Sequence, residues 1–236
     1  HKKKYREEKA EYLLEGFHLI EEAASSDAEI KELFVTQRGM KEWGDWLAVN
    51  KEISTFLVSD EVMTAMSDLP TPQGILAVMT LTSEDTPDFS GGWLLLDNVQ
   101  DPGNVGTMIR TADAFGMAGV LLGKGTADIY STKVLRSMQG SNYHLPVLQK
   151  DLADVIPVMK GKGFTVYGTE LNEEAHALDK VEKTEDFAII MGNEGQGVSQ
   201  EILSLTDQNV YIPMKGNAES LNVGVAAGIV LYHFSL

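Results

Sequence analysis

Three segments of this chain share one pattern: a short apolar strand, a loop rich in Gly, Asn, Glu or Ser, and then a helix. They are residues 94–116 (LLLDNVQDPGNVGTMIRTADAFG), 187–203 (FAIIMGNEGQGVSQEIL) and 210–236 (VYIPMKGNAESLNVGVAAGIVLYHFSL). In an open α/β sheet, loops of this kind follow the carboxyl ends of parallel strands, where ligands usually bind. We therefore expect the three loops to converge on one site at one edge of a single sheet.

From residue 93 to the end, strand and helix patterns alternate, which favours a parallel sheet covered on both faces. Strands are predicted at residues 93–96, 119–122, 146–148, 164–167, 187–191 and 210–212. Helices are predicted at residues 105–115, 132–138, 152–160, 200–205 and 221–234. Pattern alone suggests a Rossmann-like strand order. No GxGxxG follows the first of these strands, however, which disfavours a nucleotide-binding enzyme of the Rossmann type.

The amino-terminal third predicts a smaller α/β domain over residues 1–81. An amphipathic helix is expected within residues 7–24, and the other elements expected are strands at 30–35, 53–58 and 75–79 and helices at 41–49 and 61–66. Residues 82–92 (TSEDTPDFSGG) are rich in Ser, Thr, Asp, Pro and Gly and are predicted to be a linker. The second domain is then expected to cover residues 93–236.

Composition narrows the class of protein. A hydrophobic content of 43% is enough to bury real cores, and the absence of cysteine excludes disulfides, thiolate metal sites and cysteine catalysis. The five histidines are scattered without metal-ligand spacing, so we expect no metal site. The longest apolar stretch, residues 223–234, is too short to span a bilayer, and no apolar segment follows the basic amino terminus. We therefore expect a cytoplasmic protein without a membrane partner, whose natural start precedes His1 or is processed.

The formal net charge of −16 argues against simple nonspecific binding of nucleic acid, because RNA is a polyanion. The charge is uneven, since residues 1–9 hold five basic and two acidic side chains, a net of +3 that leaves −19 for the remainder. These basic residues could bind RNA locally, with modest affinity and steep salt dependence. Alternatively, they form a solvated helix face.

The three segments resemble the three motifs of the SpoU/TrmH family of RNA 2′-O-ribose methyltransferases, in the SPOUT superfamily. The likeness covers about residues 93–234 and is carried by DPGNVGTMIRTADAFG, IIMGNEGQGVS and IPMKGNAESLNVGVAAGI, which occur in the family's order. It implies an α/β parallel-sheet SPOUT fold with a carboxyl-terminal trefoil knot. The amino-terminal layout, including residues 13–23 (LLEGFHLIEEA), resembles the L30e-like RNA-binding domain that precedes the catalytic domain in many members.

The resemblance implies methylation of a ribose 2′-hydroxyl in RNA with S-adenosylmethionine as cofactor, by a homodimer whose active sites draw on both subunits. The amino-terminal domain favours ribosomal over transfer RNA, and a transfer RNA methyltransferase remains the alternative. A catalytically silent RNA-binding or ribosome-assembly factor on the same fold is a second alternative, which the presence of the motif residues disfavours. The last helix could supply part of the dimer interface through Val223, Val225, Ile229 and Val230, although core burial explains them equally well.

Matching motif positions implies which residues contact the cofactor. Gly192, Ile212 and Leu221 are expected to contact it directly. Their expected neighbours in the same pocket are Met191, Gly197, Met214 and Thr169. The glycines also suit a loop whose backbone must approach a ligand closely.

The resemblance assigns catalytic roles to Arg110, Asn104, Glu194, Ser220 and Asn222. Arg110 is flanked by apolar residues, and we expect it to be buried. We also expect it to anchor phosphate or stabilise a developing alkoxide, because a guanidinium does not serve readily as a base. Pairing with Asp97 or Asp113 is the structural alternative. On an ideal helix, Arg110 would lie about 120° around the axis from Asn104.

The remaining motif residues have two interpretations each. Asn104 would order the first loop or contact the nucleotide, and Glu194 would pair with a basic group or orient a hydroxyl. Ser220 and Asn222 could also cap the last helix. Gly224 stands where many members have serine, and residues 135–140 (LRSMQG) replace an R-A-S-A-G-like run but keep its arginine. The expected RNA contacts are Lys3, Lys4, Arg6 and Arg136, with a surface salt bridge as the alternative for Arg136.

Overall fold

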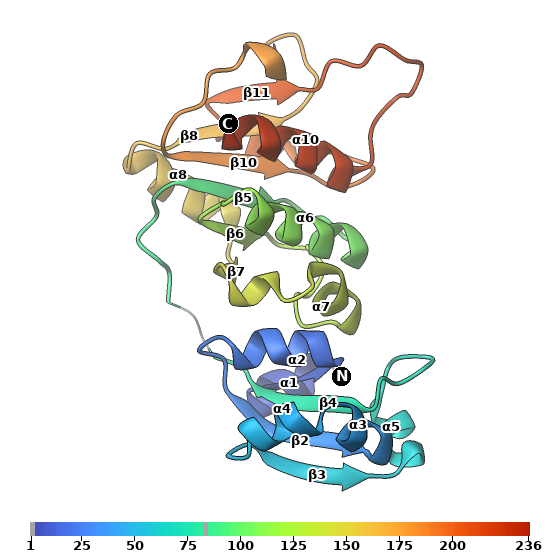
Figure 1. Cartoon of the computed structure of the whole chain (residues 1–236). Helices are drawn as coiled ribbons and strands as arrows, with labels where there is room; N and C mark the ends of the chain where they lie inside the picture. Colours follow the sequence, from blue (N-terminus) through green and yellow to red (C-terminus); the bar gives the residue numbers. More distant parts are fainter. Residues whose placement is uncertain (1–2, 83–84) are drawn as a thin grey trace.

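The computed structural model describes residues 3–82 and 85–236, which form two lobes, each built around its own sheet (Figure 1). The expected linker 82–92 therefore lies partly outside the described residues, as does Lys2 of the basic amino terminus. Among the helices in these two ranges, none has both the length and the hydropathy of a membrane span.

The amino-terminal lobe is a four-stranded sheet in the order β1-β4-β2-β3, with β4 antiparallel to β1 and β2. Its elements in chain order are α1 (Lys3–Lys9), β1 (Glu11–Glu15), α2 (Phe17–Ala24), β2 (Ile30–Thr36), α3 (Gln37–Glu42), α4 (Gly44–Val49), β3 (Ser54–Val58), α5 (Asp60–Met66) and β4 (Ile75–Thr80). The three predicted strands are present, and the strand β1 is an addition to them.

The helix predicted within residues 7–24 is wrong, because β1 interrupts it. Ala10 and Gly16 have positive φ angles of 52° and 106°, which end α1 and separate β1 from α2. Between them, Tyr12 and Leu14 are buried because β1 pairs with β4. The apolar residues at 12 and 13 thus belong to a strand, and only residues 17–24 carry the helical repeat. Residues 41–49, expected as one helix, are divided between α3 and α4 at Trp43.

The carboxyl-terminal lobe is a seven-stranded sheet in the order β7-β6-β5-β10-β8-β11-β9, and every pairing in it is parallel. Its strands are β5 (Gly92–Leu96), β6 (Gly119–Leu122), β7 (Val147–Gln149), β8 (Thr165–Thr169), β9 (His176–Ala177), β10 (Phe187–Met191) and β11 (Gln208–Tyr211). Its helices are α6 (Pro102–Ala114), α7 (Thr132–Met138), α8 (Leu152–Gly161), α9 (Gln200–Leu203) and α10 (Val223–Ser235), with short 3₁₀ turns at Ser141–Tyr143 and Leu178–Lys180.

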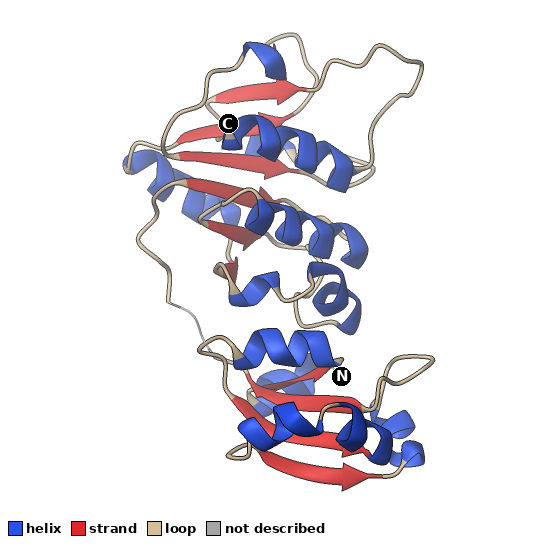
Figure 2. Cartoon of the chain, in the orientation of Figure 1, coloured by secondary structure: helices blue, strands red, loops and turns tan. Residues whose placement is uncertain are grey.

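Helices cover both faces of this sheet (Figure 2), and side chains alternate along the central strands between two buried cores. Leu94, Leu96 and Ile189 join the core under α6, α7 and α10, whereas Trp93 and Ile190 join a second core under α8 and α9. This two-sided burial confirms the prediction of a parallel sheet covered on both faces. The strand order differs from a simple Rossmann-like order, because β10 lies between β5 and β8.

The two lobes are joined by side-chain contacts near α2 and α7, which face each other in Figure 1. The hydroxyls of Tyr12 and Tyr143 are 2.9 Å apart, and Arg6 on α1 forms an ion pair with Asp128. Phe89, within the expected linker, is buried against Trp93 with ring centroids 5.0 Å apart. That part of the linker is therefore packed onto the second lobe.

Candidate active site

The three expected loops lie at one edge of the larger sheet, since the strands before them are parallel. We call residues 97–101 the first loop, 192–199 the second loop and 212–222 the third loop. β5 and β10 are neighbours, with Leu96 opposite Met191, so the first and second loops leave the sheet side by side. β11, which leads to the third loop, is separated from β10 by β8 alone.

The first loop ends at a capped helix. Asp101 is the N-cap of α6, where its Oδ1 accepts a hydrogen bond from the backbone N–H of Asn104 at 2.9 Å, and Pro102 occupies the first turn. The predicted start of this helix near Asn104 was therefore late, and Asn104 is a helical residue. The Asp-Pro pair could have revealed this, because Asp is a favoured N-cap and Pro suits the first helical position.

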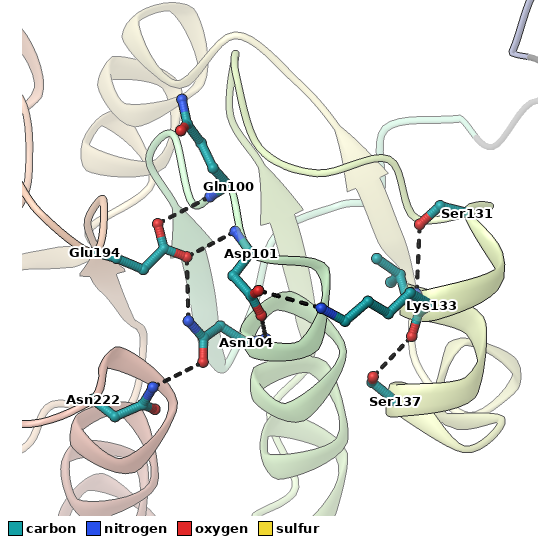
Figure 3. A network of polar contacts seen from close by, with 9 residues as sticks. Gln100, Asp101, Asn104, Ser131, Lys133, Ser137, Glu194 and Asn222 are labelled. Carbon is teal, nitrogen blue, oxygen red and sulfur yellow. Dashed lines mark hydrogen bonds and ion pairs between the residues drawn. The ribbon is translucent and has the colours of Figure 1, made fainter.

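Glu194 connects the second loop to the first (Figure 3). Its carboxylate accepts hydrogen bonds from the backbone N–H groups of Gln100 at 3.1 Å and Asp101 at 2.9 Å, and from Nδ2 of Asn104 at 3.3 Å. Partial burial by itself would raise the pKa of the Glu194 carboxylate. Hydrogen bonds from the backbone N–H groups of Asp101, Glu194 and Gln100 outweigh this effect, so the pKa of Glu194 lies below its ordinary value. Among the described residues, Glu194 has amide partners, which corrects the expectation of a basic partner.

Asn222 connects the third loop to the same group. Its Nδ2 donates to Oδ1 of Asn104 at 3.1 Å, and its own Oδ1 accepts from the backbone N–H groups of Gly224 and Val225 at 2.9 and 3.2 Å. Asn222 is therefore the N-cap of α10, as one of its two interpretations predicted. Asn104, held between Glu194 and Asn222, orders the first loop. Ser220 is exposed on the third loop.

The second loop folds back on itself at Gly192. A Cβ atom at this position would meet the backbone N of Val198 at 2.1 Å and the carbonyl carbon of Gly197 at 2.2 Å. Asn193 and Gly197 exchange two backbone hydrogen bonds of 2.9 Å. The Asn193 side chain accepts from the backbone N–H groups of Gly195 and Gln196 and donates to the carbonyl of Asn98 in the first loop at 2.9 Å. Asn193 was not among the predicted residues, although an Asn side chain in a loop commonly accepts a hydrogen bond from the backbone two residues further on.

A cavity of about 360 Å³ opens between the second and third loops. All seven residues expected to contact the cofactor line it: Thr169, Met191, Gly192, Gly197, Ile212, Met214 and Leu221. Glu194 and Ser220, expected to be catalytic, line it as well. Thr169 donates its hydroxyl hydrogen to the carbonyl of Ile190 at 2.7 Å, so this hydroxyl fixes the end of β8 beside the cavity.

The chemistry of this lining fits S-adenosylmethionine. The cavity has apolar walls, and three carboxylates border it, those of Glu170, Glu194 and Glu219. Among the described residues that line it there is no Lys or Arg. Acidic side chains around an apolar pocket suit a ligand that carries a sulfonium and an ammonium group. Glu170 and Glu219 were not predicted. Glu170 directly follows the end of β8, a position that sequence alone marks as a candidate.

Arg110 lies on α6 and is exposed. This corrects the expectation that its apolar neighbours bury it: Met108 and Ile109 point into the core, and the helix turns Arg110 outward. Within the described part of the chain, its guanidinium has no hydrogen bond or ion pair, which removes the alternative of pairing with Asp97 or Asp113. Asp97 instead accepts from the backbone N–H of Ser199 at 2.8 Å, and Asp113 binds His144.

The four basic residues expected to contact RNA lie in different settings. Lys3, Lys4 and Arg136 are exposed. Arg6 is buried and forms an ion pair with Asp128 of the other lobe. The prediction of Arg6 as an RNA contact is therefore wrong, because its charge is used to join α1 to the larger lobe. For Lys3, the solvated helix face is the interpretation that fits, since it pairs with Glu7 one turn away at 3.8 Å.

Comparison with known proteins identifies the class of protein. The chain belongs to the SpoU rRNA methylase family, whose model matches residues 93–232, and a model of the MRM3-like substrate binding domain matches residues 1–77. It is 43% identical to the 23S rRNA (guanosine(2553)-2′-O)-methyltransferase RlmP of Bacillus subtilis, over 99% of this chain and 92% of that protein. The chain is thus an RNA 2′-O-methyltransferase that uses S-adenosylmethionine.

Solved structures agree over the whole length. The SpoU methyltransferase AviRb of Streptomyces viridochromogenes, in complex with AdoMet, superposes with a TM-score of 0.88 at 26% identity, covering 100% of this chain and 93% of that one. An AdoMet-bound rRNA methyltransferase of Sinorhizobium meliloti superposes with a TM-score of 0.86 at 28% identity, covering 99% and 90%. The family resemblance inferred from the three motifs is therefore confirmed, together with the cofactor it implied.

Proposed function

We propose that this enzyme methylates a ribose 2′-hydroxyl in ribosomal RNA. The observation that carries the proposal is the joining of three distant loops into one unit, through Glu194, Asn104 and Asn222, beside the cavity that fits the cofactor. The choice of ribosomal RNA is supported by the likeness to RlmP, which acts on 23S rRNA and resembles this chain over both lobes. Transfer RNA remains the alternative substrate.

We assign the cofactor to the cavity between the second and third loops. Gly192, Ile212 and Leu221 would contact it, with Thr169, Met191, Gly197 and Met214 completing the walls. When bound, the cofactor would supply a methyl group activated by its sulfonium, so that an oxygen nucleophile could attack the methyl carbon in line while the C–S bond breaks and the neutral thioether leaves. The protein's part is to hold the donor and the ribose in register, because correct alignment supplies much of the rate enhancement in such a reaction.

Arg110 is proposed to hold the RNA rather than to remove its proton. A guanidinium keeps its proton at neutral pH, so it serves as an electrostatic partner of a phosphate or of the developing alkoxide. An exposed guanidinium that makes no hydrogen bond with the described residues is free to do this. Asn104, Glu194 and Asn222 act by positioning α6, which carries Arg110, and exposed Ser220 lies at the cavity, where it could contact substrate.

We further propose that the enzyme is a homodimer. On α10, Val225, Ile229 and Tyr232 are large apolar side chains with 54%, 40% and 53% of their surface exposed. Val230, in contrast, is buried in the core of the lobe. Core burial therefore explains one face of α10, and a dimer interface would explain the other. A second copy of the chain would cover the exposed face. In analytical ultracentrifugation, we expect the unsubstituted protein to sediment as a dimer and Ile229→Glu to sediment as a monomer.

The finer features of the fold are also proposals. A trefoil knot is supported by the path of the last segment: α10 begins after β11 but packs against α6 and β10, on the far side of β8. The L30e-like character of the first lobe, and boundaries at residues 1–81, 82–92 and 93–236, are supported by the separate four-stranded sheet. Two further points stay predictions: that the enzyme requires no metal, and that it is located in the cytoplasm.

The test is to map ribose methylation across total RNA in cells with and without this protein. We expect one ribosomal site to lose its 2′-O-methyl group in the absence of the protein and to regain it on complementation. Unchanged ribosomal RNA with a lost site in transfer RNA would favour the alternative substrate. An unchanged map, together with no calorimetric heat on adding S-adenosylmethionine, would favour a catalytically silent factor.

A further inference from the structure

Three carboxylates border the cavity between the second and third loops, and they differ in what they bind. Glu194 accepts three hydrogen bonds from the first loop and α6, and its pKa lies below its ordinary value, so it is charged at neutral pH. Glu170 is half-buried just past β8, and Glu219 is exposed on the third loop. In the described parts of the chain, neither Glu170 nor Glu219 has a side-chain hydrogen bond or ion pair. These two carboxylates are therefore available to a ligand in the cavity.

The backbone that carries Glu170 is fixed by the strands on either side of it. β8 lies between β10 and β11, the strands that lead to the second and third loops. The Glu170 N–H donates to the carbonyl of Val210 in β11 at 3.2 Å, and the hydroxyl of the preceding threonine is bonded to β10. Oε2 of Glu170 lies 3.4 Å from the position that a Cβ of Gly197 would occupy. The Glu170 carboxylate therefore lies against the second loop, at the wall of the cavity.

The surroundings of the cavity are acidic beyond its lining. Residues 170–175, which follow β8, and the second and third loops together hold five acidic side chains and one basic side chain. The basic one, Lys215, is exposed and does not line the cavity. Arg110 and Lys133, on α6 and α7, do not line it either, and Lys133 pairs with Asp101. The amino-terminal end of α10 adds a positive charge of only about half a unit, so the potential in the cavity is negative.

Methyl transfer changes the charge of the ligand on which this potential acts. S-adenosylmethionine carries a sulfonium, an ammonium and a carboxylate, which leaves one net positive charge. When the methyl carbon moves to the ribose oxygen, the electron pair of the broken C–S bond stays on sulfur, so S-adenosylhomocysteine has a neutral thioether and no net charge. The ammonium and the carboxylate are common to both. Carboxylates around the cavity therefore stabilise the donor more than the product.

We propose that Glu170 and Glu219 make the cavity select the cationic methyl donor over its neutral product, S-adenosylhomocysteine. Glu170 makes the larger contribution, because it is half-buried at the cavity wall, whereas solvent screens the exposed Glu219. The selection eases the exchange of spent cofactor for a new donor after each turnover. The inference rests on the proposed function, because it requires that this cavity be the cofactor site.

The test is calorimetric titration of the unsubstituted protein, Glu170→Gln and Glu219→Gln, with Glu185→Gln as the matched control. Glu185 is exposed before β10, at the edge of the sheet opposite to the cavity, so its substitution removes the same charge from a distant place. The probes are S-adenosylmethionine, S-adenosylhomocysteine and sinefungin, in which a protonated amine replaces the sulfonium. For each probe, the Kd of a variant is divided by the Kd of the unsubstituted protein, so that contacts common to both proteins cancel.

We expect Glu170→Gln to raise the Kd of S-adenosylmethionine and sinefungin about three- to fivefold, and that of S-adenosylhomocysteine less than about 1.5-fold. Glu219→Gln should have a smaller effect of the same kind. Added salt should reduce the difference between the probes, because ions screen the carboxylates. Glu170→Asp keeps the charge and should keep most of the preference. In turnover with RNA, S-adenosylhomocysteine should inhibit Glu170→Gln more strongly, relative to the KM for the donor, than it inhibits the unsubstituted enzyme.

Three outcomes would overturn the proposal. An equal rise in Kd for S-adenosylmethionine and S-adenosylhomocysteine would show that the carboxylates bind the ammonium that both ligands share. Ratios equal to those of Glu185→Gln would show that neither carboxylate acts on the ligand. Both results leave the cofactor site in place when Gly192→Ala weakens the binding of all three probes. Unchanged binding by Gly192→Ala would instead refute the cavity as the cofactor site, and the charge selection with it.

Discussion

Among single residues, Gly192 shows how backbone geometry shapes the wall of the cavity between the second and third loops. The second loop reverses so tightly that the position of a Cβ is taken by the backbone of Gly197 and Val198. This is steric exclusion and does not depend on an unusual φ angle. The same tight reversal places Gly197 at the cavity wall and lets the backbone approach a ligand closely.

Replacing Gly192 with alanine should therefore deform the second loop. We expect Gly192→Ala to lower the free energy of unfolding by about 1–3 kcal/mol, the usual range for inserting an atom where there is no room. Cofactor binding should weaken strongly. Thermal unfolding and calorimetric titration measure the two effects. Gly195→Ala is the control for stability, because a Cβ there would meet only Asn193 Oδ1 at 3.7 Å.

Arg110 gives a prediction of the opposite kind, a loss of activity with little loss of stability. Because Arg110 is exposed and does not line the cofactor cavity, Arg110→Ala should leave cofactor binding and the thermal midpoint nearly unchanged. Methyl transfer should fall at least about tenfold, which corresponds to about 1.4 kcal/mol in the barrier. Single-turnover transfer from labelled cofactor measures it. Unchanged turnover would remove Arg110 from the mechanism.

Among the secondary-structure elements, α6 is the one whose amino-terminal end connects α7 with the second and third loops of the site. Its N-cap, Asp101, holds the helix start, receives Lys133 and presents its backbone N–H to Glu194. The hydrogen bond from Asn104 is the largest of the effects that lower the pKa of Asp101. The element that carries Arg110 is therefore held in place from three directions, by α7, the second loop and the third loop.

Removing the Asp101 side chain should destabilise the amino-terminal end of α6. We expect Asp101→Ala to destabilise the protein by about 1 kcal/mol, the typical cost of losing an N-cap side chain, and to lower kcat more than it changes cofactor affinity. Asp101→Asn keeps a good cap and loses the charge beside Lys133, so it separates the two roles. Chemical denaturation and steady-state kinetics provide the measurements. Equal stability of all three proteins would show that the cap contributes nothing.

At the scale of the whole molecule, His144 joins the lobes. Its Nδ1 lies 2.7 Å from Oδ2 of Asp113 on α6, and its Nε2 lies 2.8 Å from Oε2 of Glu22 on α2. A Cβ at the neighbouring Gly140 would lie 2.9 Å from Glu22 Cγ, so the two lobes approach closely here. The hydrogen bonds to Asp113 and Glu22 raise the pKa of His144 above its ordinary value of 6.5, against the opposing effect of partial burial.

This raised pKa predicts a pH dependence of stability. The folded protein holds the His144 proton more tightly than the unfolded chain, so its contribution is fully present below about pH 6.5 and is lost as pH rises through the higher folded pKa. We expect the difference in thermal midpoint between the unsubstituted protein and His144→Gln to shrink between about pH 6 and pH 9. A difference that is constant over this range would exclude a charged His144 from the contact between the lobes.

Much of the local secondary structure follows directly from the pattern of residues along the chain. Strand, loop and helix patterns are local, so residues 187–191 and 119–122 could be predicted as strands with the bounds that the structure shows. Six of the seven residues predicted to contact the cofactor lie in motifs whose order and spacing mark the family, and Thr169 was predicted from its place just past a strand; all seven line one cavity. Local patterns failed where a long-range pairing overruled them: the pairing of β1 with β4 makes residues 11–15 a strand within an expected helix.

The way in which these elements come together depends on contacts between distant residues. The insertion of β10 between β5 and β8 brings Glu194 to the backbone of Gln100 and Asp101, 93 or more positions earlier in the chain. Arg6 forms an ion pair with Asp128, 122 positions later in the chain, and is therefore not part of the basic surface that was predicted from sequence to bind RNA. Periodicity encodes which side of an element is buried, whereas strand order and the docking of lobes depend on the joint packing of distant residues, and no local pattern records it.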